Sequence, residues 1–116
     1  MFDLPDLPQQ KGHDIRLLDN KVFANNTPNF APKGNIVATV PTGTGVMVMA
    51  NSNVEIFNNE IHGNETANML IVSYQSTLLE IRDPNYYPYA EAIHVHHNTF
   101  GTCGSKPGGE RGELMA

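Results

Sequence analysis

The chain has 116 residues, a formal net charge of −5 and 16% charged residues, which is the size of one domain. It lacks a basic stripe, which argues against nucleic acid as a partner, and no apolar run approaches the roughly 18 residues of a membrane span. A single cysteine, Cys103, excludes an internal disulfide framework. The 13 asparagines, with 10 glycines and 8 prolines, favour short strands joined by tight turns.

The N-terminal residues show no basic region followed by a long apolar core, so no signal peptide is predicted. Residues 2–4 are typical of the end of a strand. A frame of strand, turn and strand follows, with alternate apolar positions and an asparagine at the turn. It occurs three times, at residues 15–26, 54–64 and 92–101, and equivalent positions recur with a 39-residue period.

Two further strands are predicted at residues 46–50 and 69–74, about 23 residues apart. Links rich in turn residues occupy 28–44 and 75–90, and we expect a short strand at 36–40 within the first link. A coil of about 23 residues that carries an insertion of about 16 residues accounts for the 39-residue period. The spacings therefore predict coils of strands stacked on one another.

The predicted fold class is all-β, with about three coils and two long loop insertions over residues 1–104. The Gly-rich, charged tail over 105–116 is predicted to be disordered. Three coils bury little apolar core, because small domains bury a lower fraction of their surface. A stack of three coils therefore agrees with the loss of further coils from a longer protein.

The repeated frame resembles the right-handed parallel β-helix repeat of the pectin-lyase-like superfamily. Residues 2–5, 29–35, 41–49 and 87–89 also resemble a family of bacterial parallel β-helix repeat proteins that is exported or lipid-anchored. This resemblance covers residues 1–104 and implies a right-handed parallel β-helix. The function of that family is uncharacterised. The resemblance also implies a periplasmic or cell-surface location for the full-length relative, and that the present chain is a C-terminal piece of a longer protein. A polysaccharide is the expected partner.

The aligned frames predict a structural ladder of asparagines at the turns, formed by Asn20, Asn59 and Asn98. They also predict columns of side chains that point outward from the sheet. The first column contains Arg16, Glu55 and His94; the second contains Leu18, Phe57 and His96; the third contains Asp19, Asn58 and His97.

His94 and His96 are the candidate metal ligands, because alternate residues of a strand share one face. The nearest carboxylate in the sequence is Glu91. Met47 and Met49 are also alternate, and thioethers suit Cu(I), so copper binding is one reading. The alternative is that the histidines are ordinary solvent-facing residues and the methionines fill the core. That alternative is the stronger one, and no cofactor is predicted.

The second link carries candidate residues for a sugar site. A polysaccharide lyase needs a base and a group that neutralises a carboxylate, for which the candidates are Arg82, Tyr87 and His94. Aromatic faces for sugar stacking are available at Tyr86, Tyr87 and Tyr89. The alternative is that this tyrosine-rich loop covers an apolar face of a strand.

Three functional hypotheses follow. The leading one is a non-catalytic, extracytoplasmic surface scaffold that interacts with carbohydrate. The second is a carbohydrate-active enzyme of the lyase or epimerase class, and the present chain is expected not to be catalytic by itself. The third is periplasmic copper binding through His94, His96 and the methionines.

Overall fold

A computed structural model describes residues 1–77 and 80–106 of the chain. The predicted disordered tail therefore lies outside the described residues from 107 onward. The fold is all-β, and its short helical segments are single 3₁₀ turns. The strands are β1 (His13–Leu18), β2 (Lys21–Phe23), β3 (Thr44–Met49), β4 (Ser52–Phe57), β5 (Glu60–His62), β6 (Ala67–Val72), β7 (Glu91–His96) and β8 (Thr99–Phe100).

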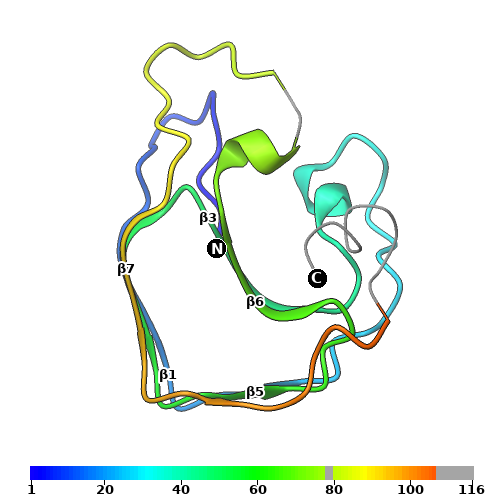
Figure 1. The fold of residues 1–116 in the computed structure, drawn as a ribbon. Coiled ribbons are helices and arrows are strands. Elements are labelled where there is room, and N and C mark those ends of the chain that lie inside the picture. The colour runs from blue at the N-terminus through cyan, green and yellow to red at the C-terminus, as the bar shows by residue number, and fades with distance from the viewer. Residues whose placement is uncertain (78–79, 107–116) are drawn as a thin grey trace.

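All pairs of these strands are parallel, and they form separate sheets that are not closed on themselves. The first sheet has the order β1-β4-β7, the second β2-β5-β8, and the third contains β3 and β6. Figure 1 looks along the stack, so that strands of one sheet overlap and the sheets form the sides of the molecule. Parallel strands cannot be joined by tight hairpins, which is why each strand returns to its sheet only after a long excursion of the chain.

The register of the first two sheets is constant. Ile15 pairs with Val54 and Val54 with Ile93, so one full period of the sequence separates each pair of partners. In the third sheet Val46 pairs with Met69, which is the shorter spacing predicted for a coil without an insertion. The sequence separations of paired residues in the three sheets therefore equal the two spacings found in the sequence.

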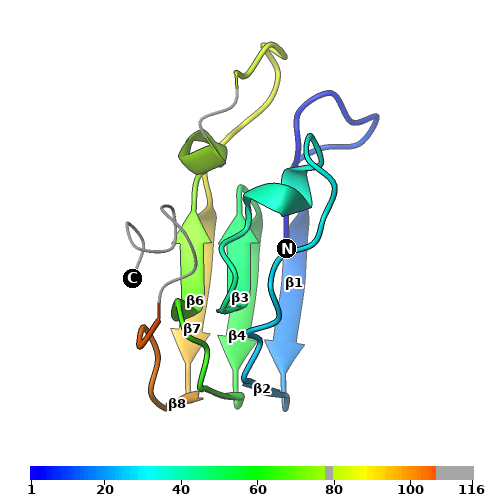
Figure 2. The same ribbon diagram turned by 90° about the vertical axis from the view of Figure 1, so that its right-hand side faces the viewer.

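The strands group into layers, which lie side by side in Figure 2. Phe2 bridges to Met49 and so adds the N-terminus to the third sheet. Each layer then contributes one segment to each sheet. Layer A is 1–3, 13–18 and 21–23; layer B is 44–49, 52–57 and 60–62; layer C is 67–72, 91–96 and 99–100.

The core runs through the middle of the stack. Buried apolar side chains of layer B form it: Val46, Val48, Val54, Ile56 and Ile61. Their counterparts in the outer layers, such as Leu17 and Val95, are only half-buried. Among the described residues, layer B has a layer on each side, whereas layers A and C each have one on one side only, so the buried core is concentrated in layer B.

Left-handed backbone conformations mark the corners between sheets. Asp19, Asn58 and His97 have φ of 58°, 57° and 53° and occupy equivalent positions of the three repeats. Each stands between the first and second sheets of its layer. Asparagine and aspartate tolerate this conformation better than other non-glycine residues do. The corner therefore repeats in all three layers, and His97 adopts it despite its larger side chain.

The predicted asparagine ladder lies next to this corner. Asn20 Nδ2 donates to Asn59 Oδ1 at 3.1 Å, and Asn59 Nδ2 donates to Asn98 Oδ1 at 3.0 Å. The backbone N–H groups of Asn20 and Asn59 donate to the same two oxygens. Asn59 is buried, so its amide satisfies backbone groups that the corner would otherwise leave without partners.

Two segments differ from expectation. The predicted strand at 36–40 is a 3₁₀ turn over Ile36–Thr39, which Asn35 caps by accepting from the Val37 N–H. β-branched residues favour strands only where a neighbouring strand is available to pair, and this loop provides none. A second 3₁₀ turn covers Tyr74–Thr77. No helix within the described residues is long and apolar enough to cross a membrane.

We predict that Asn59→Ala lowers the free energy of unfolding by about 2–3 kcal/mol, because it leaves buried donors and acceptors in adjacent layers without hydrogen-bond partners. Asn20→Ala is the matched control at the exposed end of the ladder, with an expected loss of about 1 kcal/mol or less. Urea unfolding followed by circular dichroism measures both. Equal losses would contradict a ladder centred on the buried amide.

Candidate metal centre

The outer face of the β1-β4-β7 sheet brings polar side chains into register. Arg16 pairs with Glu55, and Glu55 pairs with His94, so three functional groups follow one another across three strands. Phe57 pairs with His96 two residues further along. Alternate residues of a strand share a face, and the neighbouring apolar residues point into the core. The stacking of the layers therefore places Glu55 beside two imidazoles.

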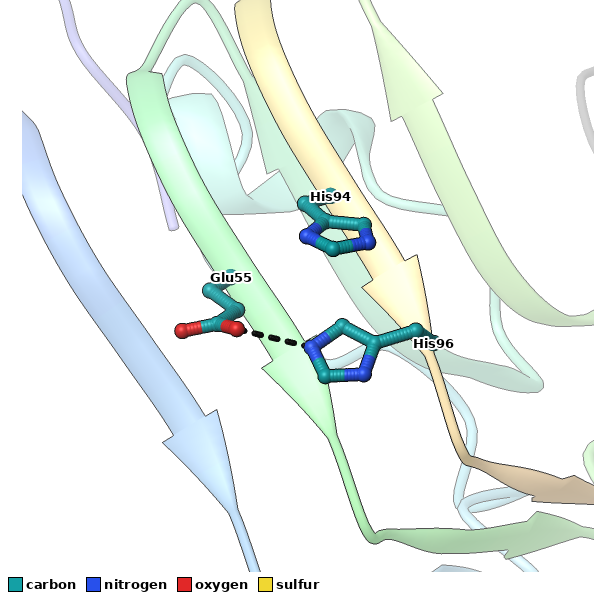
Figure 3. Close-up of side chains that lie close together, drawn as sticks. All are labelled: Glu55, His94 and His96. Atoms are coloured by element: carbon teal, nitrogen blue, oxygen red, sulfur yellow. Dashed lines mark hydrogen bonds and ion pairs between the residues drawn. The ribbon is translucent and has the colours of Figure 1, made fainter.

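Glu55, His94 and His96 form the cluster drawn in Figure 3. Each offers one ligand atom, and these atoms all lie within 4.8 Å of one another. His96 Nε2 is 2.7 Å from Glu55 Oε2. The rings of His94 and His96 are stacked with centroids 4.2 Å apart. His94 is exposed, while Glu55 and His96 are half-buried. The cluster joins a carboxylate of layer B to two imidazoles of layer C.

Neighbouring rings position His96. The His96 ring stacks on Phe57 with centroids 5.0 Å apart and an interplanar angle of 4°. His96 Nδ1 lies 2.6 Å from His97 Nδ1, so the left-handed corner residue contacts the far side of the same imidazole. These contacts leave His96 Nε2 directed at Glu55. A metal ligand held in this way by surrounding groups needs less reorganisation on binding.

The electrostatics of the cluster depend on Glu55. The imidazole of His96, which hydrogen-bonds to Glu55, holds the pKa of that carboxyl below its ordinary value, against a smaller opposing effect of desolvation. Arg16 contributes to the same lowering, with its Nε 3.5 Å from Glu55 Oε1. The carboxylate is therefore ionised at neutral pH, which is the form that binds a cation.

The donor set fits a transition metal. Two imidazoles and one carboxylate suit zinc, divalent copper and nickel, and three protein ligands leave coordination positions open. Two ligand atoms on one tetrahedral zinc ion lie about 3.4 Å apart. The separations of up to 4.8 Å therefore need to shorten by more than about an ångström when the ion binds. His94 is the exposed member of the set and has the least packing to disturb.

The methionines do not belong to this cluster. Met47 and Met49 lie on β3, in the third sheet, whereas the imidazoles lie on β7 in the first. Met49 is buried and packs in an apolar cluster with Ala50 and Tyr74. The donor set is therefore nitrogen and oxygen without thioether sulfur, which fits a divalent cation better than Cu(I).

Glu91 is not the carboxylate of the cluster. It lies at the start of β7, and its side chain accepts a hydrogen bond from the Tyr87 hydroxyl. Proximity in sequence pointed to Glu91, whereas the carboxylate beside the imidazoles is Glu55, at the position equivalent to His94 in the preceding repeat. The signal that identifies Glu55 is the column of Arg16, Glu55 and His94 across the three repeats.

The three tyrosines of the second link have different environments. Tyr86 is buried, and its hydroxyl donates to the backbone oxygen of Asp3 at 2.5 Å, yet it also lines the open groove that contains the other two tyrosines. Tyr87 and Tyr89 are 38% and 44% exposed and line an open groove of about 540 Å³ with Lys11. Their rings meet edge to face, with centroids 5.5 Å apart.

The candidate lyase residues are separated. Tyr87 and His94 line different grooves, and Arg82 lines neither of them. Arg82 is highly exposed and pairs with Glu80, with 3.2 Å between Nη2 and Oε2. The predicted base and neutralising group are therefore not gathered around one cavity.

Comparisons of the sequence with protein-family models and with known proteins, and of the fold with solved structures, found no match. Function is therefore inferred from the arrangement of this chain's own residues.

Asp83 connects the second long loop, residues 75–90, to the N-terminal segment by hydrogen bonds. Its carboxylate accepts hydrogen bonds from Gln10 Nε2 at 2.6 Å, from Asn85 N at 3.0 Å and from Asp6 N at 3.2 Å. The Gln10 hydrogen bond, followed by the two backbone bonds, holds the pKa of Asp83 below its ordinary value. Asp83 therefore stabilises the fold above the ordinary pKa of about 3.9, and this contribution is lost as pH falls through the lowered folded-state pKa.

We predict that Asp83→Asn lowers the melting temperature at pH 7, because a neutral amide is a weaker acceptor than the carboxylate. The difference from the unaltered chain shrinks as the pH is lowered from 7 to about 2.5, since the stabilisation by the ionised carboxyl declines below its ordinary pKa and is lost through the lowered folded-state pKa. Thermal unfolding at the two pH values measures the change. A difference that stays the same at both would show that charge at Asp83 is not what fastens the loop.

Proposed function

We propose that this chain is part of a right-handed parallel β-helix whose outer face binds one divalent transition-metal cation. The constant register of two parallel sheets, in which partners are one sequence period apart, supports the proposed β-helix. The observation that carries the metal proposal is the convergence of Glu55, His94 and His96, whose ligand atoms lie within 4.8 Å of one another.

Several features favour a metal over an ordinary polar surface. Two of the three ligands are half-buried, the His96 ring stacks on Phe57, and His96 Nδ1 contacts His97 Nδ1. These contacts restrain His96, which lowers the cost of ordering this ligand when a metal binds. The scaffold hypothesis and the metal hypothesis are compatible. The stacked layers act as a non-catalytic scaffold that positions the metal ligands.

Divalent copper and zinc are the expected cations. Imidazole binds both, and divalent copper heads the order of affinity among first-row divalent ions. Copper binding through His94 and His96 was the weaker of two interpretations of the sequence, and the proposal retains those two residues. It replaces Met47 and Met49 with Glu55 as the third ligand, since the methionines lie in a different sheet.

We predict that the chain binds one equivalent of Cu(II) or Zn(II) at neutral pH, and that Glu55→Gln, His94→Ala and His96→Ala each lower the affinity by more than about tenfold. Isothermal titration calorimetry measures the affinity, and the electron paramagnetic resonance spectrum of Cu(II) reports nitrogen ligands.

His62→Ala is the matched control, because His62 lies on β5 in a different sheet and pairs with Glu60. This variant should bind the metal as the unaltered chain does. Loss of binding in His62→Ala, or full binding in the Glu55 and His94 variants, would place the metal elsewhere.

The groove beside Tyr87 and Tyr89 favours a second candidate function, the binding of a polysaccharide. Lys11 lines this groove with the two exposed aromatic rings, and Glu91, which accepts from the Tyr87 hydroxyl, lines it too. Aromatic faces with a few polar groups suit a sugar, and the lysine suits a sugar that carries a carboxylate. Periplasmic or cell-surface location, implied by the family resemblance, agrees with such a partner and stays a prediction. Nothing in this groove requires catalysis.

We predict that the chain binds oligogalacturonate weakly and that Tyr89→Ala reduces this binding at least severalfold, because the ring supplies contact area to the sugar. Phe30→Ala is the control, since Phe30 is an 89% exposed aromatic residue in the other long loop. Chemical-shift titration monitors both variants. Equal effects of the two substitutions would indicate non-specific adsorption to aromatic surface.

A further inference from the structure

Arg16 occupies an unusual place beside the candidate metal centre. Its side chain is 74% exposed, and its Nε lies 3.5 Å from Glu55 Oε1, the oxygen that does not face His96. A permanent positive charge at this distance opposes the binding of a cation. A neutral residue at this position would give a higher affinity for the cation. The presence of Arg16 therefore needs another explanation.

The cluster opens toward Arg16. Arg16, Glu55 and His94 line one open groove of about 550 Å³ on the outer face of the first sheet. Asp14 also lines it, and its carboxylate is engaged by His13 and Asn53. Arg16 is the one arginine or lysine among the described residues that line this groove. An anion that enters the groove therefore meets a guanidinium at one side and two of the metal ligands at the other.

Metal binding changes the partner of Arg16. A divalent cation takes up the charge of Glu55, which weakens the pull of that carboxylate on the guanidinium. Three protein ligands leave at least one coordination position open in a four-coordinate ion and more in a six-coordinate one. The Arg16 guanidinium lines the same groove, and its N–H donors would then be available to a ligand bound on the metal ion. Its planar fork matches the two oxygens of a carboxylate.

We propose that the metal-loaded site binds a carboxylate ligand, with one oxygen on the metal ion and the other on Arg16. This inference rests on the proposed metal-binding function and names the ligand class of the same site. A monoanionic carboxylate is preferred over a doubly charged anion, because Asp14 already contributes negative charge to the groove. Without the metal, Arg16 remains paired with Glu55 and the groove has no place for the carboxylate.

The test uses the full chain loaded with one equivalent of Cu(II) and acetate as the probe. Acetate should shift the electron paramagnetic resonance spectrum of the bound copper in a saturable way. Arg16→Gln should lower the acetate affinity by about tenfold, the effect expected of one lost charge-assisted hydrogen bond. The same variant should bind Cu(II) more tightly, because a repelling charge is gone. Arg16→Lys should retain part of the acetate binding.

The opposite signs of the two effects separate this inference from a structural role of Arg16, which would weaken both kinds of binding. Copper bound without any acetate-dependent shift, or acetate affinity unchanged in Arg16→Gln, would overturn the carboxylate proposal and leave metal binding intact. Absence of copper binding, seen before acetate is added, would overturn both.

Discussion

The constraint on which the structure depends is the parallel register that pairs equivalent positions of successive repeats. Every backbone pair in the first two sheets obeys it, and so do the asparagine ladder and the left-handed corners. Parallel pairing supplies hydrogen bonds along the strands, and at the corner the Asn58 N–H donates to the backbone oxygen of His97 at 3.1 Å. The buried amide of Asn59 adds side-chain hydrogen bonds there. Backbone pairing in the sheets and the asparagine hydrogen bonds at the corners therefore favour the same alignment of the layers, as expected for stacked repeats.

The same register separates stability from recognition. Within each strand of the first sheet, one set of alternate residues points into the core and the other points to solvent. Val54 and Ile56 are buried at 1% and 0% exposure, while Glu55 between them points outward. A substitution on the outer face thus leaves the core packing in place. This separation is what allows a cluster of imidazoles and a carboxylate to lie on a strand that also holds the centre of the core.

The 39-residue periodicity predicted the features that recur in each repeat. It gave no guide to the long loops, which do not recur. The strands, the ladder of Asn20, Asn59 and Asn98 and the outward columns all follow from the regular spacing, because parallel pairing turns equal spacing into contact. The candidate ligands His94 and His96 were visible as alternate residues. Glu55 was present in the column but was not identified as a ligand, because its partner in the cluster is two residues further along β7.

The long loops have no repeated counterpart, so composition alone was the guide there. Ile36–Thr39 is rich in β-branched residues, yet it forms a 3₁₀ turn because the loop offers no strand to pair with. Tyr86 has the same side chain as Tyr87 and Tyr89, yet tertiary packing buries it against Tyr74 and the N-terminal segment. Burial of one tyrosine among three depends on contacts between residues 83 positions apart, which no local pattern encodes.

The candidate metal centre also bears on the outer layer of the stack. Among the described residues, layer C pairs with a neighbouring layer on one side only, and its inward residues Ile93 and Val95 are half-buried. It is attached to layer B by backbone pairing, by the asparagine ladder and by the contact of His96 with Glu55. An ion bound by Glu55 and the two imidazoles, as proposed above, would add a cross-link between these layers, and a ligand that binds only the folded state stabilises that state. The proposed binding would therefore be coupled to folding through one pair of strands, β4 and β7.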